Sequence, residues 1–454
     1  MRPLPASVRF IVSALAVAGL VAGCAITPSS TEADARARLQ RIGAAYQPGA
    51  ARPTPPGLRA DSPPGDFIRF AVLNHPAVAA TYHDWRAAVE AIAPARALPD
   101  PTLTFEADIA ATIMTFMPGV MFDFMTPAKR TAMAREAAAS SDVAHRAFIV
   151  AVFRTAAEAR KAWAEFAYVA EVDRLYRSTI HAVDEALALA NADYPTARGM
   201  SVSFERQIRL QNLAAQHHAH HAAVADRRAA ARARFKSALG LAPADADPPW
   251  PQPGLTVTPL PSEDELWRRA ATANPELAKM RAMVDMALAG VEVARNSGNP
   301  EPTLGVMADL RASPVMVRPT ASLSLPIWRG KLTATIAAAE ARRDAAAARV
   351  SAEQLNLAAE FAQMLFMVRE ADRMLAYLDG VALPNLERGL AFAEAGAQSG
   401  ALGPAMISET RLMAIDLRHE RVDLLRQREL AAIDLALLTA DIAPTDSPLL
   451  AQSP

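Results

Sequence analysis

The sequence has very little cysteine and few aromatic residues. Its 454 residues include one cysteine, and only 6% are aromatic. A single thiol excludes an intramolecular disulfide and a cysteine-based metal cluster. Lys and Arg (47) nearly balance Asp and Glu (48), so net charge gives no argument for nucleic-acid binding. We find no Gly-rich phosphate loop, nucleophile elbow or HExxH motif, and therefore expect no enzymatic activity and no cofactor.

Beyond the N-terminus, the sequence also lacks the roughly 18 consecutive apolar residues that a membrane-spanning helix needs. The N-terminal apolar run Phe10–Ala22 is short, follows the basic residues Arg2 and Arg9, and leads into LVAGC, which ends at Cys24. Such a segment is typical of an export signal. LVAGC resembles the bacterial lipoprotein signal, in which the cysteine takes diacylglycerol and begins the mature chain. Because Ala25 follows and not Asp, the resemblance implies the outer membrane; the alternative is an ordinary signal peptide with a chance cysteine.

What the chain does contain is an internal repeat. DPTLTFEADI (100–109) parallels EPTLGVMADL (301–310), and ARGMSVSFE (197–205) parallels ALGPAMISE (401–409). A period of about 200 residues is far longer than that of a solenoid, and indicates a duplication. We predict a signal peptide (1–23), an extended lipid-anchored tether (24–65), a first structural repeat (66–241), a Pro-rich linker (242–264), a second repeat (265–440) and a C-terminal tail (441–454).

Each repeat includes a long stretch that is almost free of Gly and Pro. The stretches Thr131–Asp193 and Lys331–Ala397 would each form a helix on the order of 90–100 Å long. Gly380 and Pro384 interrupt the second stretch and predict a kink or break there. Rods of this length are too long for the core of a compact domain. We therefore predict a mainly α fold with a small β part, built from duplicated long-helix hairpins.

Each repeat also contains two short segments with one polar and one apolar side. Polar and apolar residues alternate in Thr102–Ala110, Val120–Met125, Thr303–Leu310 and Val315–Leu325, as in strands with two different faces. The polar sides carry Glu106, Asp108, Asp123, Asp309 and Arg318. In lipid only a closed barrel satisfies the strand edges, and four strands are too few, so we predict that three chains supply twelve. The polar residues would then face the pore; the alternative is a half-buried sheet packed on helices.

Together these features resemble the TolC-like outer-membrane efflux protein family. The motifs that carry the resemblance are LVAGC, the repeated DPTLTFEA segment, SLSLPIWRGKLTATIAAAEARRDAAAARV (322–350) and VALPNLERGLAFAEAGAQSGALG (381–403). The resemblance covers nearly all of residues 66–438 and is better in the second half. It implies a homotrimer with a 12-stranded transmembrane β-barrel, continuous with an α-barrel in the periplasm. It also implies a passive exit duct that works with a periplasmic adaptor (membrane fusion) protein and an inner-membrane pump.

The resemblance further implies a periplasmic entrance at the turns that join the long helices, residues 194–207 and 398–411. The candidate gate residues are Gly199, Glu205, Gly403, Met406, Glu409 and Arg411. The two glycines give the backbone freedom that a helix reversal needs. Three copies of Glu409 would make an acidic ring that favours cations. Better-known members carry a second acid where this chain has Met406, and the alternative for Glu409 and Arg411 is that both are ordinary solvated residues.

A histidine cluster and several methionines leave the cargo open. His217, His218, His220 and His221 include pairs that share one helix face, and such pairs can bind zinc, copper or nickel. An exposed polar patch is the alternative. The methionines at 114, 117, 121 and 125 indicate either soft-metal cargo or ordinary packing. Heavy metals and drugs are thus both considered as cargo, and a lipid-anchored periplasmic adaptor without a pore is the alternative function.

Overall fold

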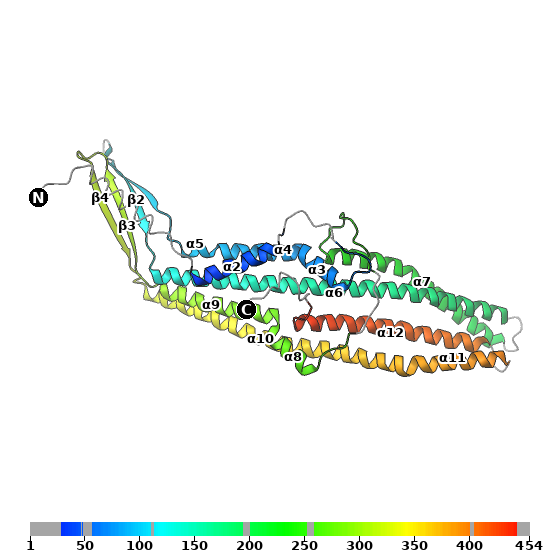
Figure 1. The fold of residues 1–454 in the computed structure, drawn as a ribbon. Helices are drawn as coiled ribbons and strands as arrows, with labels where there is room; N and C mark the ends of the chain where they lie inside the picture. Colours follow the sequence, from blue (N-terminus) through cyan, green and yellow to red (C-terminus); the bar gives the residue numbers. More distant parts are fainter. Residues whose placement is uncertain are drawn as a thin grey trace.

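The computed structural model describes residues 29–46, 48, 57–109, 113–193, 200–251, 258–399 and 404–442. Long helices lie side by side in an elongated layer, and a small sheet projects from one end of it (Figure 1). The strands are β1 (Thr102–Ile109), β2 (Ile113–Asp123), β3 (Glu301–Asp309) and β4 (Met316–Ser324). The helices are α2 (Ser30–Ala45), α3 (Pro64–Asn74), α4 (Pro76–Glu90), α5 (Ile92–Arg96), α6 (Pro127–Asp193), α7 (Met200–Ala238), α8 (Glu263–Ala273), α9 (Pro275–Asn296), α10 (Arg329–Tyr377), α11 (Leu383–Gln398) and α12 (Pro404–Leu438).

Both predicted long helices are present. Helix α6 runs unbroken for 67 residues. The second stretch is divided into α10 and α11 by a five-residue π-helical segment, η2 (Leu378–Ala382). Gly380 lies inside η2, and Pro384 occupies the first turn of α11, where a missing N–H costs nothing. The predicted interruption is therefore confirmed, and it takes the form of a π-bulge and not of a chain reversal.

The helices form an open layer whose membership changes along its length. In the half away from the sheet, α7 packs on α6, α6 on α12, and α12 on α10 and α11 (Figure 1). In the half nearer the sheet, α9 takes the place of α12 between α6 and α10, and α4 covers α6. Among the described helices, none is both long enough and apolar enough to cross a membrane.

The main hydrophobic core lies where α3, α4, α6 and α7 meet. Its centre consists of aromatic side chains that are almost fully buried, among them Phe67, Trp85, Phe148 and Phe235. The rings of Phe67 and Phe235 lie 5.6 Å apart, and those of Trp85 and Phe148 stack at 5.7 Å. Burying each such side chain stabilises the fold by about 1.5–3 kcal/mol. This core holds α3, α4 and α7 against α6.

The prediction of an extended tether over residues 24–65 is wrong for Ser30–Ala45, which forms helix α2. The Ser29 hydroxyl accepts a hydrogen bond from the backbone N–H of Glu32 at 3.2 Å and caps the helix. Ile42 and Tyr46 are buried in the main core. The carboxylate of Glu32 is only 1% exposed and lies 2.7 Å from the Arg96 guanidinium. Apolar burial and this ion pair therefore fix α2 to the body.

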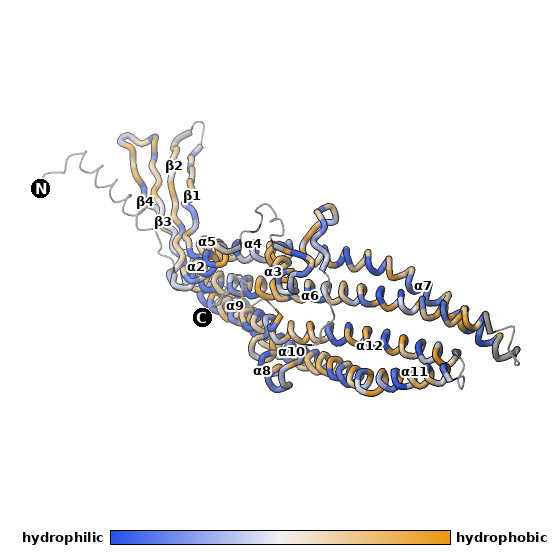
Figure 2. Tube along the Cα trace, turned by 45° about the vertical axis from the view of Figure 1, so that its right-hand side comes forward, coloured by the Kyte–Doolittle hydropathy of each residue, from blue (hydrophilic) through white to orange (hydrophobic). Residues whose placement is uncertain are grey.

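The four strands form one antiparallel sheet in the order β1-β2-β3-β4. The two hairpins are thus joined through β2 and β3, which come from different repeats. The second strand was predicted at Val120–Met125 but begins at Ile113 and ends at Asp123. Pro118 and Gly119, which we expected to precede the strand, lie within it. Figure 2 shows apolar and polar residues along each strand, in contrast to a uniformly apolar core strand.

Candidate functional site: a two-faced sheet

The sheet has one apolar and one polar face over all four strands. Directly paired residues of neighbouring strands lie on the same face, so the register assigns every residue. One face carries Leu103, Phe105, Ala107, Phe116, Val120, Phe122, Leu304, Val306, Ala308, Val317, Ala321 and Leu323. The other carries Thr102, Thr104, Glu106, Asp108, Met117, Met121, Asp123, Thr303, Met307, Asp309, Met316, Arg318, Thr320 and Ser322. All five predicted pore-facing residues therefore lie on one face.

The apolar face is uncovered in the single chain. Phe105 is 63% exposed and Val317 is 65% exposed, although both are large apolar residues. No described helix packs across the sheet, which projects beyond the end of the helical layer (Figure 1). The outer edges of β1 and β4 are likewise unpaired within the described chain. An apolar surface of this extent with two open edges marks a site of membrane or protein contact.

The polar face is held by short hydrogen bonds between side chains of neighbouring strands. The Thr303 hydroxyl donates to Asp123 at 2.6 Å, and the Thr115 hydroxyl donates to Asp108 at 2.9 Å. Glu106 is exposed. Asp309 differs from our expectation of a solvated residue, because it is only 4% exposed and lies 3.5 Å from the Arg318 guanidinium. The face thus presents Glu106, Asp108 and Asp123 to solvent, while Asp309 is covered.

A local two-fold relation joins the two repeats at the centre of the sheet. Gly119-Val120-Met121 pairs antiparallel with Gly305-Val306-Met307, so each glycine lies opposite the methionine of the other strand. A Cβ at Gly305 would lie 2.8 Å from Met121 Cγ and 2.9 Å from the Val120 carbonyl oxygen. At Gly119 the corresponding distances are 2.5 Å to Met307 Cγ and 2.9 Å to the Val306 oxygen. Each methionine therefore fills the space that the opposite glycine leaves.

The candidate gate residues are only partly brought together. Gly199 and Gly403 lie outside the described residues. Glu409 of α12 lies 3.8 Å from the Arg206 guanidinium of α7, and Glu205 pairs with Arg209 on its own helix. The Arg411 guanidinium lies 3.4 Å from both Glu185 of α6 and Glu394 of α11, while Met406 is exposed. The first and second hairpins are therefore linked near their ends by exposed ion pairs, which are weak individually.

The four histidines of α7 are not gathered into a metal-ligand set. In the described part of the chain, no group of three or more His, Cys, Asp or Glu is arranged to hold a metal ion. The His221 ring lies 3.5 Å from Asp173, and His218 lies 3.5 Å from Asp184. The Tyr176 ring lies between His220, at 6.0 Å, and His419 of α12, at 4.6 Å. The cluster therefore connects α6, α7 and α12.

Burial lowers the pKa of His217 in this cluster and of the neighbouring His419 in α12. The pKa of His217 is lowered mainly by burial, and the pKa of His419 is lowered by burial and by the neighbouring His217. The His419 ring also lies within hydrogen-bonding distance of the Thr179 hydroxyl, at 3.0 Å. Neutral imidazoles are thus favoured at the point where the two hairpins meet.

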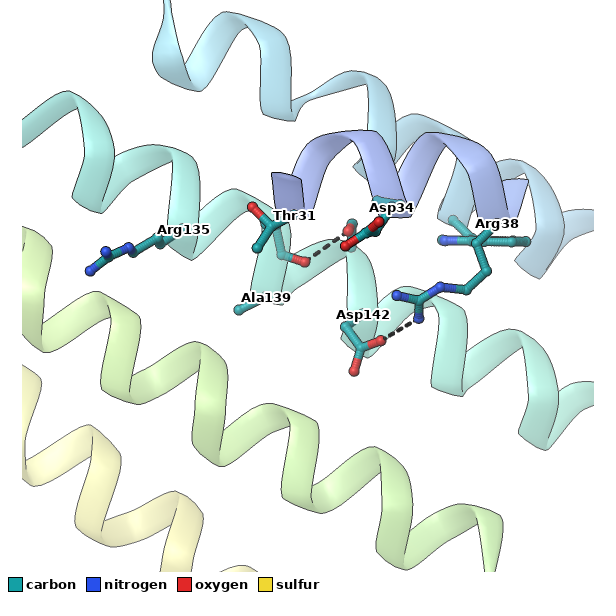
Figure 3. Close-up of a pocket in the computed structure, with 10 residues that line it drawn as sticks. Thr31, Asp34, Arg38, Arg135, Ala139 and Asp142 are labelled. Carbon is teal, nitrogen blue, oxygen red and sulfur yellow. Dashed lines mark hydrogen bonds and ion pairs between the residues drawn. The ribbon is translucent and has the colours of Figure 1, made fainter. Parts of the chain in front are cut away.

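The sequence did not predict the contact between α2 and α6. A hollow of about 300 Å³ lies there, and the Arg38 guanidinium donates across it to Asp142 at 2.9 Å (Figure 3). The hollow is also lined by Thr31, Asp34 and Arg135. Helix α2, which forms one side of the hollow, could have been predicted from its N-terminal pattern Ser29-x-x-Glu32, which is typical of a capping box.

The chain combines duplicated long-helix hairpins with a two-faced, four-stranded sheet, and comparisons with known proteins find this architecture elsewhere. Residues 266–441 match the family model described as outer membrane efflux protein. No curated protein sequence matches the chain. The first repeat is outside the family match, in agreement with the weaker resemblance that its motifs show.

Solved outer-membrane channels share the fold over most of the chain. The open state of the Neisseria gonorrhoeae MtrE outer membrane channel is 15% identical, with a TM-score of 0.72, and the match covers 86% of this chain and 91% of that one. The outer membrane protein VceC from Vibrio cholerae is 15% identical, with a TM-score of 0.65 and coverage of 84% and 96%. CusC, described with transmembrane channel formation, is 15% identical, with a TM-score of 0.68 and coverage of 87% and 98%. The predicted resemblance to TolC-like outer-membrane efflux proteins is thereby confirmed, in fold over most of the chain and in sequence over the second repeat.

Proposed function

We propose that this protein is the exit duct of a tripartite efflux system: a passive outer-membrane channel formed by three copies of the chain. The observation that carries the proposal is the uncovered apolar face of the sheet, which is continuous over all four strands. Exposing this face to water costs about 25 cal/mol of free energy for each Å² of apolar surface. Lipid removes that cost.

Ring closure follows from the two open edges of the sheet. Lipid offers no hydrogen bonds to the free backbone groups of β1 and β4, so each edge must pair with another strand. The edges belong to different strands, and β1 of one chain therefore pairs with β4 of the next in a head-to-tail ring. Three chains give twelve strands, which is within the range of outer-membrane barrels. The face that carries Glu106, Asp108 and Asp123 then lines water.

The helical layer supports the same arrangement, because it too has two different open edges. Helix α7 forms one edge, and α10 with α11 forms the other (Figure 1). A ring of three layers makes a tunnel that extends the barrel into the periplasm, with its entrance near Glu205, Met406, Glu409 and Arg411. An adaptor protein and an inner-membrane pump deliver cargo there, and Cys24 carries the lipid anchor. The duct itself catalyses no reaction.

A pore-free, lipid-anchored periplasmic adaptor is the competing function. Such a protein has no use for an apolar face with a polar reverse side, which a soluble sheet would cover with its own helices. Two substitutions at neighbouring positions of β1 distinguish the adaptor function from the duct function. Phe105→Arg puts a charge on the apolar face, and Glu106→Arg puts the same side chain on the polar face.

The test uses the full chain, purified from membranes in detergent. For the wild type we expect a trimer by native mass spectrometry and discrete single-channel conductance in planar lipid bilayers. Phe105→Arg should abolish insertion, because a lipid-facing Arg costs up to about 2–4 kcal/mol per chain. Glu106→Arg should insert and conduct. A monomer without conductance, or equal behaviour of the two variants, would refute the duct. Sensitivity of a deletion strain to metal ions and to drugs then separates the two cargo classes.

A further inference from the structure

The free edge of α10 carries large apolar side chains at a regular spacing. Phe366 and Tyr377 are eleven residues apart, which is three helical turns within about 20°, and each is 51% exposed. Residues nine apart in a helix are two and a half turns apart and point to opposite sides. Val368 is nine residues before Tyr377, and Leu357 is nine residues before Phe366, so these two point to the other side of α10. Both of these are buried. Phe366 and Tyr377 therefore project away from the layer.

The free edge of α7 is instead made of small residues around one carboxylate. Ala222, Asp226 and Ala233 are exposed. Ala231 and Phe235, nine residues after Ala222 and Asp226, are buried against α6. The exposed three are thus also directed away from the layer.

Contacts across the layer place these two edges at the same height. The ring of Tyr176 in α6 reaches His220 of α7 and His419 of α12. Two residues further along α12, Arg421 binds Asp379 of the π-helical segment at 2.6 and 3.2 Å. Tyr377 precedes Asp379 by two residues and Ala222 follows His220 by two. These contacts place Tyr377 and Ala222 at similar heights along the layer.

The two edges match in spacing and in charge. Helices α10 and α7 run in opposite directions, so equal steps backward from Tyr377 and forward from Ala222 reach equal heights. A step of four residues leads from Tyr377 to Arg373 and from Ala222 to Asp226. A step of eleven residues leads from Tyr377 to Phe366 and from Ala222 to Ala233. Neither Arg373 nor Asp226 has an ion-pair or hydrogen-bond partner in the part of the chain that the structure describes.

We propose that these edges form the seam between neighbouring copies of the chain, with Arg373 of one copy paired to Asp226 of the next. Tyr377 and Phe366 then pack over Ala222 and Ala233, where the short side chains leave room. The inference rests on the proposed ring, because a closed ring has no translation along its axis and brings together residues of equal height. It adds to that ring the specific residues that hold the periplasmic helices of adjacent copies together.

Disulfide trapping in the full-length membrane protein tests the seam. We expect Tyr377→Cys with Ala222→Cys, after mild oxidation, to give covalent dimers and trimers on a denaturing gel. The matched control, Tyr377→Cys with Ala233→Cys, displaces the second thiol by eleven residues, or about 16 Å, and should give monomer. Each single variant should also give monomer. Dimers from Tyr377→Cys alone would mean that like edges meet, and would overturn the proposal.

Charge exchange gives an independent readout of the same contact. Arg373→Glu and Asp226→Arg should each speed subunit dissociation, by roughly twofold to fivefold for each seam, as for other exposed ion pairs. The double variant, which restores the pair with its charges exchanged, should return to the wild-type rate. Additive effects of the two changes would overturn the pairing. If the wild type is a trimer in native mass spectrometry but the Tyr377→Cys/Ala222→Cys variant does not cross-link, this seam is refuted and the duct is not. If the wild type is a monomer, the duct itself is refuted.

Discussion

The reciprocal Gly–Met contacts at the centre of the sheet lead to a prediction about Gly305. A Cβ at this position would lie 2.7 Å from the Thr320 hydroxyl oxygen and 2.9 Å from the Val120 carbonyl oxygen. Distances under 3.0 Å force a displacement, and the carbonyl belongs to the β2–β3 pairing, so it moves only at the expense of the sheet. Since overpacking of this kind costs about 1–3 kcal/mol, Gly305→Ala should destabilise the protein by that amount.

The control is Gly330→Ala, in the first turn of α10, where a Cβ would have no neighbour within 4 Å. Alanine is favoured over glycine in a helix, so this variant should be neutral or more stable by up to about 1 kcal/mol. Scanning calorimetry of the purified protein in detergent provides the comparison. We expect a lower unfolding temperature for Gly305→Ala, by about 1 °C for each kcal/mol, because the unfolding entropy of a chain of 454 residues is large.

A second substitution separates the methionine contact from the other two contacts of the new Cβ. Met121→Ala removes the Cγ that would lie 2.8 Å away, but leaves the contacts with the Thr320 hydroxyl and the Val120 oxygen. Met121→Ala should therefore be less destabilising in the Gly305→Ala background than in the wild type. Two results would contradict this reasoning: Gly305→Ala unfolds at the temperature of Gly330→Ala, or the effects of Gly305→Ala and Met121→Ala are simply additive. In either case the methionine does not occupy the space above the glycine.

Three further predictions concern the N-terminal helix, a buried histidine and the pore. Glu32→Gln should weaken the attachment of α2, because the Arg96 guanidinium loses the carboxylate 2.7 Å away, and faster amide hydrogen exchange in α2 would reveal it. Burial, reinforced by the nearby Arg38, lowers the pKa of His145 to about 4. Between pH 6.5 and pH 4 the unfolded chain therefore binds more protons than the folded chain, and the free energy of unfolding decreases as the pH is lowered. The loss should reach up to about 3 kcal/mol and be smaller in His145→Gln, as measured by denaturant unfolding at pH 7 and pH 4.5. Glu106→Arg should shift the reversal potential of the channel away from cation preference, whereas unchanged selectivity would place Glu106 outside the pore.

The faces of the sheet were predictable from sequence because they depend on a local period. Side chains alternate along a strand, and antiparallel pairing joins residues of the same face. The alternation alone therefore places Asp108 and Asp123 on the polar side of their strands. The burial of Asp309 was not predictable in this way. It depends on Arg318 of the neighbouring strand, which reaches the carboxylate only after the chain folds.

The start of β2 and the helix α2 were missed for different physical reasons. Pro118 and Gly119 favour a turn when they are judged alone. In the sheet Pro118 joins the apolar face opposite Phe105, and Gly119 provides the space that Met307 fills, so tertiary packing overrides the local preference. For α2 the local signal was present in the Ser29 cap, but the surrounding Pro- and Ser-rich composition outweighed it in our prediction.

The duplication explains why both parts of the molecule have two different open edges. Strands β1 and β4 come from different repeats, as do α7 and α10, so a ring of three chains is also a ring of six similar units. The contact between chains should then resemble the contact between repeats within one chain, which the structure shows directly. Within the chain, α6 and α12 are joined by opposite charges, with Arg426 at 2.7 Å from Glu165 and Lys161 at 2.6 Å from Asp434. A seam between chains in which Arg373 meets Asp226 repeats this arrangement, and so the same sequence pattern that closes one pair of repeats is able to close the ring.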